Sequence, residues 1–200
     1  MESLNVDNVL QFLKIAYNLK HSVRKGWEYR GIKNPESIAS HMYNMGLMTF
    51  LLGDDSNLDR LLCLQLAIVH DLAESIVGDI TPQDNVSPEA KHKLEDEAMN
   101  ELTGYLGHPI GNKIYDLYKE YERKESAEAK FVKDLDLFDM IFTASEYEIK
   151  ENSLGKLQDF FDSTHGRINN AFIKQLSTTL EHHRQTNIEK QCSENGNQND

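Results

Sequence analysis

Cysteine, proline and glycine are scarce in this chain of 200 residues, and each scarcity limits what the protein can be. Four prolines and eleven glycines leave few points at which a helix must break. The two cysteines, Cys63 and Cys192, are too few for a disulfide framework. This cysteine usage fits a reducing compartment.

A surplus of positive charge is also missing. The chain has 21 Lys and Arg against 33 Asp and Glu, a net charge of −12, which disfavours a protein that grips a nucleic-acid backbone. A small anionic substrate stays open, because a bound cation supplies local positive charge. The N-terminus, MESLNVDNVLQFLK, lacks the layout of a secretory signal, and we expect no apolar run long enough to span a bilayer. We therefore expect an intracellular, cytoplasmic protein, with a nuclear location left open, and neither a membrane nor a nucleic-acid polymer as partner.

Apolar residues recur at helical spacing along most of the chain, and no stretch alternates as a half-buried strand does. A first helical stripe runs from Val6 to Tyr17, and a second helix begins after the capping residue Ser37. The pattern predicts further helices over 58–75, 88–106, 109–122, 127–150 and 170–188, with a shorter one over 154–161. We predict an all-α, single-domain protein over residues 1–188, followed by a disordered tail over 189–200 that lacks apolar anchors.

The most informative feature is the pair His70-Asp71, which follows the apolar run LQLAIV. Glu74 comes four residues after His70, on the same face of the expected helix. Asp79 follows Gly78, where a loop can turn its carboxylate back towards the helix end. With His41 upstream, these imidazoles and carboxylates suit a divalent cation such as Mn²⁺, Mg²⁺, Co²⁺ or Zn²⁺. Such a cation activates water and clamps a phosphate, so we predict a metal-dependent hydrolase of a phosphorylated small molecule.

Asp136 is the candidate fourth member of this set. It lies in AKFVKDLDLFDMIF, a helical segment that is strongly apolar on one side. Its position borders the buried side, where a carboxylate needs a cation or a hydrogen-bonding partner. The alternative is a surface acid of the helix that pairs with Lys133 or Lys130.

The set HD-x₂-E-x₄-D, with His41 before it and Asp136 after it, resembles the signature of the HD-domain metal-dependent phosphohydrolases. Residues 9–188 resemble more closely the HD-domain 5′-deoxynucleotidases, in the segments GWEYRGIKNPESIASHMYNM, LAIVHDLAESIVGDITPQDN, SAEAKFVKDLDLFDMI and LQDFFDST. The resemblance implies an HD-domain helical bundle, usually a homodimer. It also implies hydrolysis of 2′-deoxyribonucleoside 5′-monophosphates to deoxyribonucleoside and phosphate with Mn²⁺, Co²⁺ or Mg²⁺.

The resemblance also implies roles for individual residues. The ligands of the principal metal would be His41, His70, Asp71 and Asp136. The catalytic residues would be Asp71 and Glu74, with Glu74 as general acid/base. Glu74, Asp79 and the carbonyl of Ile80 would hold a second cation, and the sequence leaves open whether Glu74 is a ligand or a proton shuttle.

Substrate recognition is implied for Trp27, which would shape the sugar pocket, and for Asp79. Bacterial relatives have an arginine directly before that tryptophan, whereas this chain has Gly26. Arg24 and Arg30 are better suited than Lys25 to replace its bidentate phosphate contacts. Without the resemblance, Trp27 would be interpreted as a packing anchor under a loop.

Two alternatives remain. An HD-type phosphodiesterase or pyrophosphohydrolase with a dinuclear site needs further histidines, and only His92 and His108 are available, both in polar surroundings typical of exposed residues. A non-catalytic nucleotide-sensing module is disfavoured, because the set of candidate site residues is intact.

Overall fold

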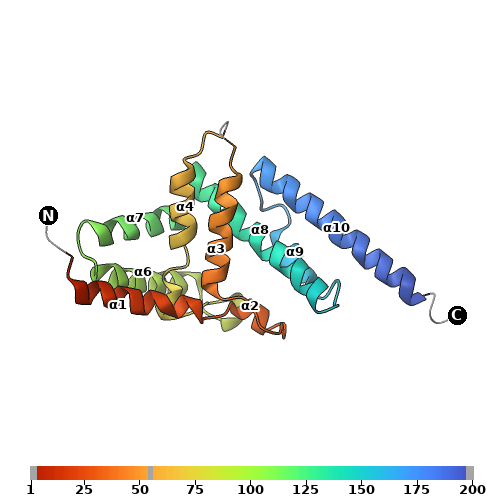
Figure 1. The fold of residues 1–200 in the computed structure, drawn as a ribbon, viewed down its shortest axis with the longest axis horizontal. Helices are drawn as coiled ribbons and strands as arrows, with labels where there is room; N and C mark the ends of the chain where they lie inside the picture. The colour runs from red at the N-terminus through yellow and green to blue at the C-terminus, as the bar shows by residue number, and fades with distance from the viewer. Residues whose placement is uncertain (1–3, 54–55, 197–200) are drawn as a thin grey trace. The chain divides into compact units, whose positions relative to one another are not determined.

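The computed structural model describes residues 4–53 and 56–196 as helices joined by turns (Figure 1). Within these residues, the extended pairing is one antiparallel bridge between Val23 and Ser37. The expected all-α class is confirmed. The chain divides into two compact units, Met1–Val132 (unit 1) and Lys133–Asp200 (unit 2), with the boundary inside helix α8 (Ala127–Lys150).

Among its described residues, unit 1 has seven α-helices ahead of α8. They are α1 (Val6–Ala16), α2 (Lys25–Glu28), α3 (Ile38–Met48), α4 (Arg60–Val69), α5 (Glu74–Val77), α6 (Pro88–Gly104) and α7 (Ile110–Arg123). The start signals read from the sequence are in place: Ser37 Oγ accepts a hydrogen bond from the backbone of Ser40, and Ser87 Oγ accepts one from Ala90. Helix α3 packs against α4, and α7 packs against both α4 and α6. Their shared core includes Ile38, Met42, Val69, Leu72, Met99, Leu102 and Tyr118.

The helix expected over 58–75 is interrupted in its last third. Helix α4 ends at Val69, and α5 begins at Glu74. In between, the backbone forms tight i to i+3 hydrogen bonds, from Leu72 N to Val69 O and from Glu74 N to Asp71 O, each 3.0 Å long. The apolar pattern hides this break because Leu72 and Ala73 remain core residues. The His-Asp pair therefore sits in a turn between two helices.

Helix α1 packs on the core with the face opposite to its apolar stripe. Val6, Leu10, Leu13 and Tyr17 are exposed, and the side packed on the core carries Phe12, Ile15 and Ala16. Both sets recur at helical spacing, so periodicity alone cannot choose between them.

Unit 2 contains the rest of α8, α9 (Gln158–Thr164) and α10 (Ala171–Gly196). Buried Asp134 accepts hydrogen bonds from the backbone N–H groups of Asn169 and Asn170, at 3.0 and 2.6 Å, just before α10 begins. A carboxylate at this position satisfies donors that the first turn of a helix leaves open.

Helix α10 continues through Gly196, whereas the sequence predicted a disordered tail from residue 189. Ser193 Oγ donates to the carbonyl of Glu189 at 2.9 Å, and the side chains of Gln185 and Glu189 also pair. Such i, i+4 contacts and the absence of proline extend a helix without apolar anchors. The last residues of the expected tail, 197–200, lie outside the described residues.

The segment Arg60–Asp84 is long and apolar enough to cross a membrane by composition, with a mean hydropathy of 1.5 over an 18-residue window, whereas we expect no such run from the sequence. Half of that window is buried inside the protein, and the segment is divided among α4, α5 and a short 3-10 turn. Core helices of soluble proteins meet the same criterion, so the segment is weak support for a membrane span.

Candidate metal centre

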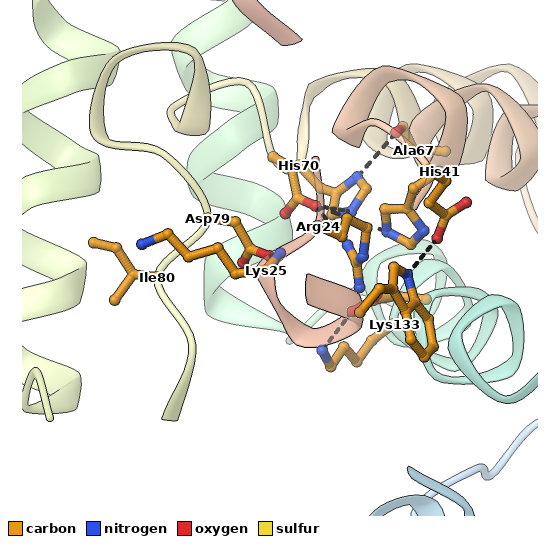
Figure 2. Close-up of polar contacts among 12 residues, drawn as sticks. Arg24, Lys25, His41, Ala67, His70, Asp79, Ile80 and Lys133 are labelled. Carbon is orange, nitrogen blue, oxygen red and sulfur yellow. Dashed lines mark hydrogen bonds and ion pairs between the residues drawn. The ribbon is translucent and has the colours of Figure 1, made fainter. Parts of the chain in front are cut away.

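His41 comes from the first turn of α3 and is completely buried. The bridge between Val23 and Ser37 fixes the start of this helix, so the position of the imidazole is set by backbone pairing as well as by packing. Its ring meets that of His70 edge-on, with ring centroids 5.3 Å apart (Figure 2). Two histidines from separate helices are therefore neighbours inside unit 1.

His70 is oriented by the end of α4. Its Nδ1 lies 2.9 Å from the carbonyl oxygen of Ala67, one turn back along the helix. A carbonyl accepts a proton and cannot donate one, so Nδ1 carries the hydrogen of the neutral ring and Nε2 keeps its lone pair. This is the arrangement by which proteins prepare a histidine as a metal ligand.

The lone pair of His70 points at a carboxylate. Nε2 of His70 lies 3.1 Å from Oδ2 of Asp71, and Nε2 of His41 lies 3.7 Å from the same oxygen. Among the described residues, Nε2 of His70 is buried and has no hydrogen-bond partner. Two electron-rich atoms this close require a cation or a proton between them. The ligand atoms of these three residues all lie within 4.8 Å of one another, so nitrogen and oxygen donors of the type that divalent metals prefer fit a metal ion here.

Asp71 is held in its ionised form. Burial raises the pKa of its carboxyl, but the interactions with His70, His41 and Arg24 outweigh burial and hold that pKa well below the usual value. Nη1 of Arg24 lies 3.4 Å from Oδ2 of Asp71. An ionised carboxylate is the form that binds a metal.

Glu74 behaves in the opposite way. Its side chain, at the start of α5, is buried, and burial together with the negative charges of Asp71 and Asp79 raises its pKa well above the model-compound value. Oε2 of Glu74 has no hydrogen-bond partner among the described residues. A buried carboxyl group with a raised pKa beside an ionised one is typical of a general acid/base.

Asp79 and Ile80 follow Gly78, whose φ of 73° is a conformation that favours glycine. Oδ2 of Asp79 accepts a 2.7 Å hydrogen bond from the backbone N–H of Lys25, at the start of α2. The carbonyl of Ile80, expected to bind a second cation, accepts a 3.0 Å hydrogen bond from Nζ of Lys91.

Sequence reasoning missed Lys91. It lies in the polar run KHKLEDE of α6, which is typical of a solvated helix face. Burial lowers the pKa of its ammonium, but the acidic groups of Glu95, Glu74, Asp71 and Asp79 outweigh burial and raise that pKa above its usual value. The lysine therefore stays charged. The available signal was the spacing of Lys91 and Glu95, an i, i+4 pair at 3.5 Å.

The candidate substrate residues differ in their surroundings. Arg24 contacts Asp71, as described above, and Figure 2 draws its guanidinium beside the two histidines. Trp27 is 1% exposed, and its indole N–H donates to Glu36 at 3.0 Å, which fits the packing anchor considered from the sequence. Arg30 is half-buried in the turn after α2.

Asp136 belongs to unit 2, where Nζ of Lys133 lies 2.6 Å from its Oδ2. The surface pairing considered from the sequence is therefore present. The side chain of Asp136 remains only 16% exposed.

The two further histidines considered for a dinuclear site are both exposed, as expected. His92 pairs with Glu122 at 2.9 Å, and these two residues and Glu95 form another group of side chains that could hold a metal ion. His108 precedes Pro109 at the start of α7.

A buried His-His-Asp centre at the end of a core helix, in an all-α protein, is the arrangement of one known class. Residues 16–177 match the model of the HD domain, and the chain belongs to this HD-domain family. Members of the family bind a divalent metal, and the centre described above has the donors for one.

Within the family, the chain is similar to the human protein named 5′-deoxynucleotidase HDDC2, at 50% identity over 94% of this chain and 91% of that protein. It is 49% identical to 5′-deoxynucleotidase hdd1 of Schizosaccharomyces pombe over 76% of this chain and 79% of that protein. Among solved structures, PH0347 of Pyrococcus horikoshii has a TM-score of 0.70 and 30% identity, covering 86% of this chain and 96% of that one.

Proposed function

We propose that this protein is a divalent-metal-dependent 5′-deoxynucleotidase that hydrolyses 2′-deoxyribonucleoside 5′-monophosphates to deoxyribonucleoside and phosphate. The observation that carries the proposal is the buried cluster of His41, His70 and Asp71 in a chain with curated relatives of that name across eukaryotes. By the family resemblance, Asp136 is proposed as the fourth ligand. The ion is Mn²⁺, Co²⁺ or Mg²⁺.

A divalent cation held here supplies positive charge that neutralises the phosphate and lowers the pKa of water. The side chains supply the rest of the chemistry. Asp71 stays ionised, and His70 is fixed in one tautomer by Ala67. Glu74, whose buried carboxyl has a raised pKa, is the proposed general acid/base that protonates the departing 5′-oxygen.

Substrate binding is assigned to residues around this centre. Arg24, already beside Asp71, is the best placed of the basic residues to take the role of the arginine that Gly26 replaces. Trp27, Asp79 and Arg30 are proposed to line the substrate site, as the resemblance implies. In the same way we propose a homodimer in the cytoplasm, and one domain over residues 1–188.

The proposal is tested by phosphate release from a panel of nucleotides with the metal-stripped protein and with added Mn²⁺, Co²⁺ or Mg²⁺. The expected result is metal-dependent release confined to deoxyribonucleoside 5′-monophosphates. Release only from cyclic or triphosphorylated nucleotides would reject the proposal in favour of a phosphodiesterase or pyrophosphohydrolase. Nucleotide binding without turnover would favour a sensor.

A further inference from the structure

Lys91 is the basic residue of α6 that reaches the acidic side of the centre. Its ammonium lies 3.0 Å from the carbonyl oxygen of Ile80 and 3.5 Å from Oε1 of Glu95. The acidic groups of Glu74, Asp71 and Asp79 all raise the pKa of this ammonium. The contact with Glu95 explains why the lysine is held there, since that carboxylate is itself buried and needs a positive partner.

Four acidic groups raise the pKa of Lys91, namely Glu95, Glu74, Asp71 and Asp79. Asp71 and Asp79 both repel the charge of Glu74, which is 5% exposed. Oε2 of Glu74 has no hydrogen-bond partner among the described residues. A buried carboxyl oxygen without a hydrogen-bond partner, with other acids acting on it, attracts a cation.

We propose that the ammonium of Lys91 and a second divalent cation compete for the place beside the Ile80 carbonyl and the carboxyl groups of Glu74 and Asp79. The inference rests on the proposed function and on the second cation that the family resemblance implies for these groups. The carbonyl oxygen of Ile80 already accepts a hydrogen bond from Lys91, so a cation that bound this oxygen would have to share it with the ammonium. Lys91 therefore sets how tightly the second ion binds, and the ion displaces the lysine when it enters.

The test is a calorimetric titration of Mn²⁺ into the metal-stripped full chain. The proteins are the wild type, Lys91→Met and the control Lys93→Met, which removes an exposed lysine of the same helix that pairs with Glu97. The first, tight binding step is expected to be the same in all of them. In Lys91→Met the dissociation constant of the second step falls about tenfold or more, or a second step appears where the wild type shows none. The reason is that a unit positive charge has been removed from the proposed site of the second ion.

Further variants keep the outcome unambiguous. Lys91→Gln removes the charge but keeps a hydrogen-bond donor. It replaces Lys91→Met in the test if Lys91→Met disturbs folding. Adding Glu74→Gln to Lys91→Met abolishes the gain. A gain that survives Glu74→Gln places the new ion elsewhere, for example at Glu95 and His92, and overturns the proposal. Equal second steps in wild type and Lys91→Met, or a change as large in Lys93→Met, also overturn it.

These titrations contain no nucleotide, so they are independent of whether deoxynucleotides are hydrolysed. A protein that shows the metal competition but releases no phosphate contradicts the proposed activity alone. A protein that releases phosphate but shows no competition contradicts the role of Lys91 alone.

Discussion

Glu148 of unit 2 is buried against a guanidinium, whereas Glu74 of unit 1 is buried beside other carboxylates. Nε and Nη2 of Arg184 lie 2.7 and 2.9 Å from the two oxygens of Glu148, and the backbone N–H of Leu157 adds a third bond at 2.7 Å. Arg184 also bonds Gln158 and stacks over the ring of Phe161. Glu74, by contrast, keeps an oxygen without a hydrogen-bond partner among the described residues.

For this reason the pKa values of the two glutamates are shifted in opposite directions. Burial raises the pKa of Glu148, but the bonds from Arg184 and Leu157 outweigh it and lower the pKa. At Glu74, burial and the neighbouring acids Asp71 and Asp79 act in the same direction, and the pKa rises well above 4.5.

This difference separates a structural cluster from a functional one. The ion pair of Glu148 and Arg184 is closed by its own partners, so nothing from outside is needed to complete it. The cluster of His70, Asp71 and Glu74 leaves acceptors facing one another, an arrangement that costs stability until a cation arrives.

The largest expected effect is on catalysis, from Glu74→Gln. Removing the acid/base group lowers the turnover number for deoxynucleotides about 10² to 10⁴-fold, while the metal-free protein stays folded. Steady-state phosphate release and thermal melting measure both. Glu97→Gln, at an exposed position of α6, is the control with unchanged turnover. Turnover of Glu74→Gln close to that of the wild type would remove the catalytic role of Glu74.

The next effect is on stability, from Glu148→Ala. Leaving Arg184 buried without its carboxylate lowers the free energy of unfolding by about 3–5 kcal/mol, while the turnover of the folded protein is unchanged. Urea unfolding measures it, with Glu146→Ala at an exposed position of the same helix as control. If both variants lose equal stability, the pair does not stabilise unit 2.

Arg24→Met tests the arginine that contacts Asp71. Its contact is 3.4 Å long, against 2.7 Å for the shorter contact between Arg184 and Glu148, so we expect Arg24 to rearrange towards a phosphate. Loss of a charged hydrogen bond to the phosphate raises KM about 10 to 100-fold. Arg30→Met is the matched comparison. A larger rise in KM for Arg30→Met would assign the phosphate contact to Arg30.

The smallest expected effect is the pH dependence of metal-free stability. The raised pKa of Glu74 gives a contribution that is fully present below pH 4.5 and is lost as pH rises from there towards its folded pKa. The lowered pKa of Glu148 gives one that is present above pH 4.5 and is lost as pH falls. Glu74→Gln is therefore more stable than the wild type above pH 4.5, by on the order of 1 kcal/mol, and equal to it below. Urea unfolding across pH 4–8 measures the difference, and a constant difference at all pH values would contradict the assignment.

Helical periodicity predicted the all-α class, and the caps at Ser37 and Ser87 are local signals that the sequence carries directly. The approach of His41 to His70-Asp71 is not local, and it was predicted from the resemblance to the HD-domain signature. The sequence did not predict the break at residues 70–73, since apolar spacing continues through the turn. Lys91 was missed because a helical face in a polar run looks solvated until the loop of Asp79 and Ile80 folds over it. Such non-local contacts are set by packing and leave no periodic trace in the sequence.

The most direct test of the metal centre compares the wild type with Asp71→Ala by equilibrium dialysis against Mn²⁺, followed by phosphate release from a deoxyribonucleoside 5′-monophosphate. Because Asp71 faces both histidines, we expect the variant to bind the ion at least about 100-fold more weakly and to lose turnover in parallel, with its metal-free melting preserved. Ion uptake and turnover equal to those of the wild type would contradict a metal centre at these residues.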